Sequence, residues 1–189
     1  MKNKITSSSV AGIYIFISIN NIISENKFEN NYFGLQLEDT QETNTFKQNN
    51  ISNNTVGIFL GRSCNNIIFE NNITNNIEYG FYIVESSNNN FIYHNNIIFN
   101  NISGFDICVN IWNDSYPFGG NYGSDYSGID IYHGPNQNIP GSDGIGDTPY
   151  ELPCEYATDY YPFMEPDGWI NHPPNKPEKP NGTKKEKLE

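Results

Sequence analysis

Apolar positions recur with a fixed period along the first half of the chain. A glycine followed by an apolar–any–apolar triplet begins at Gly12, Gly34, Gly57, Gly80 and Gly104, so successive copies lie 22, 23, 23 and 24 residues apart. Two further phrases, each an asparagine followed within two residues by a β-branched or aromatic residue, repeat between these glycines. They begin at Asn21, Asn44, Asn66 and Asn90, and at Asn26, Asn49, Asn71 and Asn95. Three phrases that keep one period indicate an internal structural repeat.

Each phrase has the alternation of a strand with one buried face, and the turns between phrases are too short for helices. Three short strands per repeat are typical of one coil of a parallel β-helix. We therefore predict an all-β, right-handed parallel β-helix of about five coils over residues 3–109, with coils stacked about 4.8 Å apart. The predicted inward columns are Ile13/Leu35/Ile58/Phe81/Phe105, Ile15/Leu37/Leu60/Ile83/Ile107, Ile23/Phe46/Ile68/Ile92 and Phe28/Ile51/Ile73/Ile97.

Asparagine is the most unusual feature of the composition, with 32 copies in 189 residues. The asparagines that open the two repeated phrases fall into two columns, and a side-chain amide both donates and accepts hydrogen bonds. Stacked amides therefore satisfy one another, and we predict two asparagine ladders along the coils. This assigns the asparagine excess to structure. The glycines of the repeat mark positive φ or close backbone approach.

The first residues, Met-Lys-Asn-Lys before an apolar stretch, have some features of a signal peptide. Gly12, however, is in phase with every later coil, so we interpret the segment as the first coil. That interpretation leaves an exposed edge at the start of the stack. We therefore expect the chain to be part of a longer multidomain protein.

Charge divides the chain into three segments. Residues 110–168 contain ten acidic residues and no Lys or Arg, whereas the formal net charge of the whole chain is −12. We expect this acidic, Tyr- and Gly-rich segment to close the β-helix as a cap, and residues 169–189, rich in Pro and Lys, to be a linker or tail. The acidic balance excludes nucleic acid as a partner, and no apolar run is long enough for a membrane span. Three cysteines do not form a disulfide scaffold.

The repeat, with its Asn-Asn-x-Ile and Gly-Ile-x-Leu phrases, resembles the NosD-like β-helix family, within the class named for carbohydrate-binding proteins and sugar hydrolases. The cap phrases at residues 110–128, 143–150 and 159–164 resemble the C-terminal caps of archaeal surface proteins of this kind. The resemblance implies an extracytoplasmic β-helix at the cell surface or secreted, with no established reaction. It also implies a copper-related periplasmic function as a less favoured alternative, because His, Met and Cys are few and scattered here.

Two kinds of outward position carry candidate chemistry. Arg62, the only arginine, falls between Asp39 and Glu85 on adjacent coils, so these three residues are candidates for a lyase-like or acidic-sugar site, or for a surface ion-pair ladder. Exposed aromatic residues form further columns, and we expect them to be sugar platforms, an interface or simple cross-strand stacks. The candidate ligand-binding pairs are Phe59 with Tyr82 and Phe69 with Tyr93.

Calcium is the only cofactor that the sequence suggests. Asp143 and Asp147 flank Gly-Ile-Gly in a phrase similar to the end of a calcium loop, and Asp125 and Asp130 are possible further ligands. The earlier acidic positions of such a loop are absent, so an alternative is a turn region with solvated acids. No catalytic residue is assigned.

The leading functional hypothesis is a non-catalytic extracytoplasmic module with a structural or carbohydrate-binding role, whose partner is a carbohydrate or a cell-surface polymer. The alternative is a polysaccharide lyase or glycoside hydrolase that acts on an outer face near Arg62. A glycosidase, however, requires two facing carboxylates, and no such acid pair recurs in the repeat.

Overall fold

The chain winds into a solenoid of three parallel sheets, followed by an irregular cap. The computed structural model describes residues 2–153 and 157–171. Sheet A contains β1 (Lys4–Thr6), β4 (Lys27–Glu29), β7 (Asn50–Ser52), β10 (Asn72–Thr74), β13 (Asn96–Ile98) and β15 (Tyr122–Gly123). Sheet B contains the longer strands β2 (Ala11–Phe16), β5 (Phe33–Glu38), β8 (Val56–Gly61), β11 (Tyr79–Val84) and β14 (Ile102–Asp106). Sheet C contains β3 (Ile22–Ser24), β6 (Thr45–Lys47), β9 (Ile67–Phe69) and β12 (Phe91–Tyr93).

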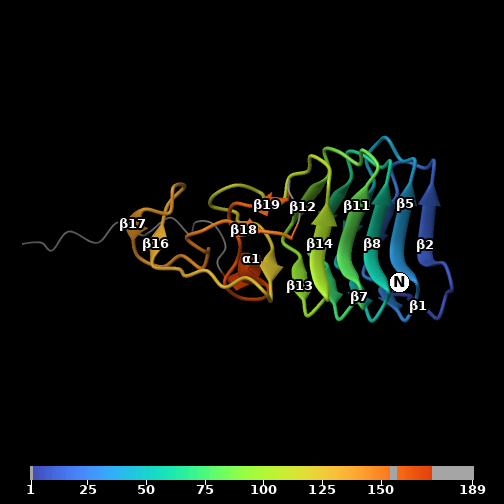
Figure 1. Cartoon of the computed structure of the whole chain (residues 1–189), viewed down its shortest axis with the longest axis horizontal. Helices are drawn as coiled ribbons and strands as arrows, with labels where there is room; N and C mark the ends of the chain where they lie inside the picture. The colour runs from blue at the N-terminus through green and yellow to red at the C-terminus, as the bar shows by residue number, and fades with distance from the viewer. Residues whose placement is uncertain (1, 154–156, 172–189) are drawn as a thin grey trace, which may run out of the picture.

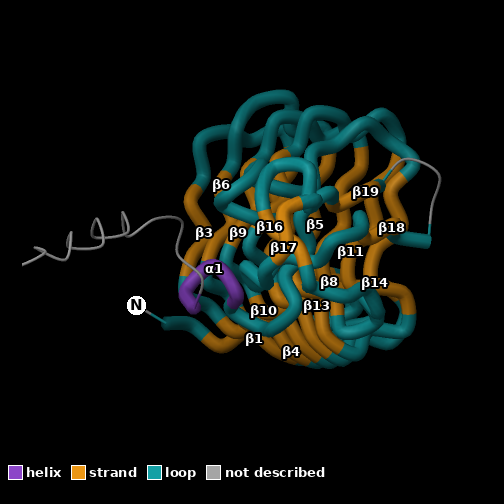
Figure 2. The backbone as a smooth tube through the Cα atoms, turned by 90° about the vertical axis from the view of Figure 1, so that its left-hand side faces the viewer, coloured by secondary structure: helices purple, strands orange, loops and turns teal. Residues whose placement is uncertain are grey.

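Each of the first four coils contributes one strand to each sheet, and the fifth adds β13 and β14, so equivalent strands lie side by side along the long axis (Figure 1). Figure 2 shows the same strands from the end of the stack, where they surround a common interior. The predicted parallel β-helix of about five coils is confirmed. Ile23, Phe46, Ile68 and Ile92 pair in register across sheet C, and Phe28, Ile51, Ile73 and Ile97 do so across sheet A.

The prediction for the fifth coil of sheet B is wrong by one residue. Gly104, not Phe105, pairs with Phe81, and Asp106, not Ile107, pairs with Ile83. Phe105 therefore points outward beside Tyr82, and Ile107 is half exposed. The reason lies in the cap: a Cβ on Gly104 would lie 2.4 Å from Leu152 Cδ2, so cap side chains fill the space that a bulky inward residue would take.

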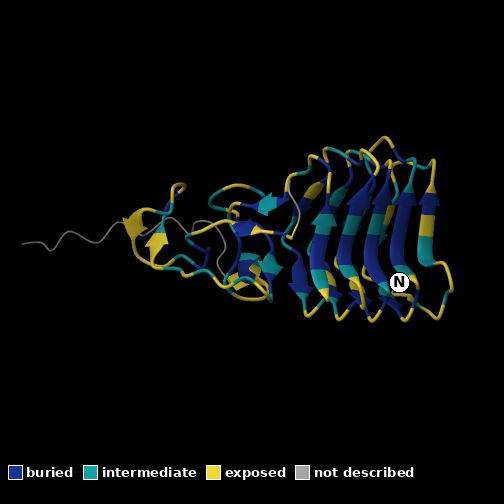
Figure 3. Cartoon of the chain, viewed as in Figure 1, coloured by how far each residue is buried: buried dark blue, intermediate teal, exposed yellow. Residues whose placement is uncertain are grey.

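The interior of the coils is an apolar column whose inward residues are fully buried from the second coil onward, whereas Ile13 and Ile23 of the first coil are partly buried. Figure 3 colours each residue of the ribbon by its burial. In the first four coils the repeated glycine is the second residue of the sheet B strand. A Cβ on Gly57 would lie 2.5 Å from the Gly80 carbonyl oxygen and 2.9 Å from Asn76 Nδ2. Close approach between coils, rather than a positive φ, therefore requires glycine there. Positive φ instead occurs at the turns, and several asparagines, including Asn53 and Asn75, adopt it.

Both predicted asparagine ladders are present, and each is longer than predicted. In every step an Nδ2 donates to the Oδ1 of the next coil, as in Asn71 Nδ2 to Asn95 Oδ1 at 3.0 Å. The first ladder runs Asn21, Asn44, Asn66, Asn90, Asn110, and the second runs Asn3, Asn26, Asn49, Asn71, Asn95, Asn121. A third ladder, which we did not predict, runs Asn31, Asn54, Asn76, Asn100.

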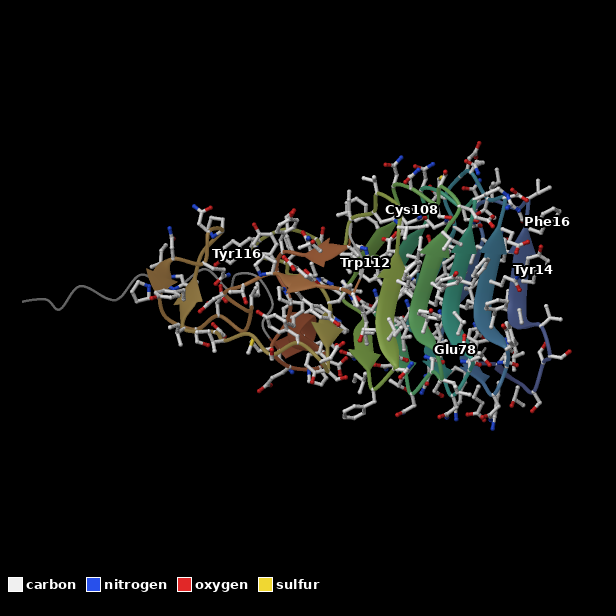
Figure 4. All side chains as sticks on the ribbon, in the orientation of Figure 1. Tyr14, Phe16, Glu78, Cys108, Trp112 and Tyr116 are labelled. Carbon is white, nitrogen blue, oxygen red and sulfur yellow. The ribbon has the colours of Figure 1, made fainter. Side chains whose placement is uncertain are left out.

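The cap begins at the last coil and covers the end of the apolar column. Trp112 is 1% exposed, packs edge-on against Phe81 and lies where the coils meet the cap (Figure 4). Two short antiparallel pairs and one helical turn complete the cap. They are β16 (Tyr132–His133) with β17 (Ile139–Pro140), β18 (Tyr150–Glu151) with β19 (Thr158–Asp159), and α1 (Gly168–Asn171).

The described cap extends to Asn171, beyond the boundary that the sequence suggested. Trp169, which we assigned to the tail, lies in α1 and stacks on His94 at 5.4 Å between ring centroids. The rest of the predicted tail, residues 172–189, lies outside the described residues. Within the described ranges, no helix has the length and apolar character to cross a membrane.

Candidate binding surfaces

The outer face of sheet B carries a continuous row of aromatic rings, which we call the aromatic strip: Phe33, Phe59, Tyr79, Tyr82 and Phe105. Ring centroids on successive coils lie 5.0 Å apart for Phe33 and Phe59, 5.9 Å for Phe59 and Tyr82, and 5.4 Å for Tyr82 and Phe105. All five side chains are half-buried. The strip therefore presents ring surface to solvent along the axis of the solenoid.

The period-2 alternation of the strands places these rings outward. Phe59 lies between the inward residues Ile58 and Leu60, and Tyr82 occupies the same position one coil later. The repeat predicted this pair. Phe105 was predicted to point inward because the fifth coil was placed one residue out of phase, and Phe33 and Tyr79 were not predicted because they occupy other positions of their strands.

Polar side chains adjoin the aromatic strip at the N-terminal coils. Tyr14 donates its hydroxyl to Glu38 Oε2 at 2.7 Å, and Gln36 Nε2 donates to Glu38 Oε1 at 3.1 Å. The hydrogen bond to Glu38 raises the pKa of Tyr14. Gln36 Oε1 is buried and has no hydrogen-bond partner among the described residues. Figure 4 shows Tyr14 at the end of the stack that is remote from the cap.

Arg62 lies between Asp39 and Glu85, as the repeat predicted. Its Nε is 2.6 Å from Asp39 Oδ1 and its Nη2 is 3.2 Å from Asp39 Oδ2, while Nη1 contacts Glu85. The guanidinium lowers the pKa of Asp39. These three residues, with Gln41 and Ser86, border an open hollow of about 520 Å³. Because carboxylates engage Arg62 from both neighbouring coils, it is poorly placed to bind the carboxylate of an acidic sugar.

The second predicted aromatic pair lies on the outer face of sheet C. Phe69 and Tyr93 stack with centroids 5.4 Å apart and an interplanar angle of 6°, and Lys47 Nζ lies 5.9 Å from the Phe69 centroid. The row continues through His94 to Trp169. His94 is partly buried there, and this burial lowers its pKa. This row ends under α1, so it also supports the cap.

The four carboxylates suggested for calcium accept hydrogen bonds from the protein, and Asp130 accepts one from Asp143 N at 3.2 Å. Asp125 accepts from Ser103 and Tyr150, Asp130 from Ser142 and Gly144 N, and Asp147 from Ile131 N and Tyr132 N. Asp143 Oδ1 accepts from Ile145 N. In the described part of the chain, no three residues among His, Cys, Asp and Glu are grouped so as to hold a metal ion. Calcium binding stays a prediction.

Comparison with known families agrees with this architecture. The family model described as Periplasmic copper-binding protein (NosD) matches residues 1–128, which include every coil of the solenoid. This chain belongs to the NosD family. No curated protein and no solved structure matches it. Membership of this periplasmic NosD family, together with the β-helix fold, supports an extracytoplasmic β-helix module.

The described residues of this NosD chain do not fit the copper site that the family description implies. Copper prefers thiolate, thioether and imidazole ligands gathered at one point. His94 Nε2 instead lies 2.8 Å from the Phe118 carbonyl oxygen, with its ring stacked on Trp169. The described thiols, Cys64 and Cys108, are free, and no cluster of three candidate ligands is found over the same residues.

Proposed function

We propose that this NosD-family chain is a non-catalytic module that binds an uncharged polysaccharide along the aromatic strip. The observation that carries the proposal is the continuity of the strip over four coils, with ring centroids 5.0–5.9 Å apart from coil to coil. A polymer lying along the coil axis would meet one ring after another. Half-buried rings offer a rigid apolar surface to sugar rings at little entropic cost.

The surroundings of the strip supply polar contacts and set the charge of the ligand. Tyr14, Gln36 and Glu38 form a hydrogen-bonded group beside the rings, suited to hydroxyl groups of a sugar. Carboxylates outnumber cations there, since Glu38, Asp39 and Glu85 lie around a single cation, Arg62. An acidic polymer would be repelled, so an uncharged one is favoured.

Tyr82→Ala is expected to weaken polysaccharide binding about tenfold, because Tyr82 contacts three other rings of the strip and its loss divides the surface. Affinity electrophoresis or a glycan array with neutral polysaccharides measures the effect. Phe69→Ala is the matched control, since it removes a stacked ring from sheet C and should leave binding unchanged. Absence of binding to every neutral polysaccharide, or equal binding by Tyr82→Ala, would contradict the proposal.

Arg62→Ala separates binding from catalysis. A binding module should retain its affinity for the polysaccharide, because Arg62 is paired with Asp39 and Glu85 rather than presented to a ligand. A lyase that used Arg62 would lose turnover. Incubation of the wild type and the variant with polysaccharide, followed by measurement of reducing ends and unsaturated products, tests this. Product formation by the wild type that disappears in Arg62→Ala would establish the enzymatic alternative instead.

A further inference from the structure

The cap contains a hollow of its own, about 420 Å³ in volume. It lies between the turn that joins β16 to β17 and the segment after β19. Its lining is mainly uncharged and polar, with tyrosine rings at its border: Asn113, Ser115, Pro135, Asn136, Gln137, Asp147, Pro149, Tyr160 and Tyr161. A hollow of this size lies within the range of small-molecule binding sites.

Gln137 is the unusual residue of this hollow. Both polar atoms of its side chain, Oε1 and Nε2, are buried and have no hydrogen-bond partner among the described residues. An unpaired buried amide is costly, and native structures rarely leave both of its groups unsatisfied. Gln137 also has a φ of 44°, a left-handed conformation that Gly or Asn adopts more easily. The unpaired amide takes no part in the turn itself, which is closed by Gln137 N donating to the Gly134 carbonyl oxygen.

Hydrogen bonds hold the walls of the hollow. The Tyr161 hydroxyl donates to the Pro135 carbonyl oxygen at 3.2 Å and so joins the two walls. Asp147 already accepts from two backbone N–H groups, Ile131 N and Tyr132 N. Tyr160 is 60% exposed at the border, where its ring is free to contact a ligand. The cap contains no Lys or Arg, so the hollow is unsuited to an anion.

We infer that this hollow, called here the cap pocket, is a site for one or two uncharged sugar residues, and that the Gln137 side chain, whose amide is buried, turns into it on binding, so that this amide donates to one hydroxyl group and accepts from another. A hydroxyl-rich ring supplies both a donor and an acceptor, as Gln137 requires, and an apolar face for Tyr160. The cap pocket shares no residue with the aromatic strip, so the inference does not depend on the polymer-binding proposal.

NMR spectra of the full chain test the inference through the side-chain amide signals of Gln137. The chain is titrated with glucose, galactose, mannose, N-acetylglucosamine and cellobiose. At least one of these sugars should shift the Gln137 signals. Gln137→Leu and Tyr160→Ala should each weaken that binding about tenfold or more. Gln137→Leu should also fold with an unchanged or higher Tm, because it removes an unpaired buried amide.

Two controls make the result specific. Gln48→Leu changes an exposed glutamine that bonds Glu70 on another face, and should leave sugar binding unchanged. Tyr82→Ala should affect the polymer but not the small sugars, so failure of one site is distinguishable from failure of the other. Absence of any shift at Gln137 with all five sugars, or full binding by both cap variants, would overturn the cap pocket.

Discussion

Asn71→Ala is expected to lower the free energy of unfolding by about 3–5 kcal/mol, an unusually large effect for a polar residue. Asn71 is fully buried, and its Oδ1 accepts from both Asn49 N and Asn49 Nδ2 at 3.0 Å. Its Nδ2 lies within hydrogen-bond distance of the Phe46 and Phe69 carbonyl oxygens and of Asn95 Oδ1. Removing the amide therefore leaves donors and acceptors of three coils unpaired in the interior.

Urea unfolding monitored by circular dichroism measures this change. Asn50→Ala is the matched control, since Asn50 is an exposed asparagine in β7 whose side chain lies outside the ladders. That control should change stability by about 0.5 kcal/mol or less. A comparably small effect of Asn71→Ala would show that the ladder amides gain little over water, and would refute their structural role.

The ladders also show how much of the fold the sequence could predict. A period of about 23 residues placed Asn21 and Asn26 in columns, because identical residues recur at identical phase. The third ladder was missed because its spacing to the repeated glycine changes: Asn31 and Asn54 lie three residues before a glycine of the repeat, whereas Asn76 and Asn100 lie four before it. The ladder ends at Asn110 and Asn121 were missed because they belong to the cap, where the period is lost.

The predicted phase of the fifth coil is wrong for a related reason. Gly104 continues the glycine phrase in the sequence, but Ser103 takes the structural place of Gly80 one coil later. Only the contacts of Gly104 with Leu152 and Trp112 explain the shift, and these come from sequence far outside the repeat. The same holds for Gln137, whose unpaired amide depends on how the cap folds. Arg62 and its two carboxylates, in contrast, lie at one phase of the repeat and could be found from spacing alone.

Two of the three ladders end beside a buried carboxylate. Each amide within a ladder donates its Nδ2 to the Oδ1 of the next coil, but Asn110 and Asn121 end their ladders and have no next amide. Asn100, which ends the third ladder, donates instead to the Ile73 carbonyl oxygen. Asn110 Nδ2 donates to Asp106, which also accepts from Trp112 Nε1. Asn121 N donates to Asp159 Oδ2 at 2.5 Å, and Asn121 Nδ2 lies 3.3 Å from the same oxygen. Asp106 and Asp159 are both fully buried.

Because of Asp159, the free energy of unfolding is expected to fall as the pH rises from 4 to 7. Complete burial raises the pKa of Asp159 to about 7, although Asn121 N, Asn121 Nδ2 and Tyr161 N donate to its carboxylate and oppose the shift. In the unfolded chain an aspartate has a pKa of about 3.9. The native state therefore binds more protons than the unfolded state between these values. The stabilisation is complete below pH 4 and is lost as the pH rises through 7, with a total of up to about 4 kcal/mol.

Asp159→Asn isolates this contribution, since the amide keeps an oxygen for Asn121 and cannot titrate. Burial also raises the pKa of Asp106, and ion pairs lower the pKa values of Glu29 and Asp39, so the wild-type slope contains several contributions. Those groups remain in the variant. Their contributions therefore cancel when the free energies of unfolding of the two proteins are subtracted at each pH. Urea unfolding at pH 4, 5.5, 7 and 8 should show a steeper loss of stability in the wild type than in Asp159→Asn. Equal slopes would mean that Asp159 is ionised throughout, with the donors of the ladder outweighing its burial.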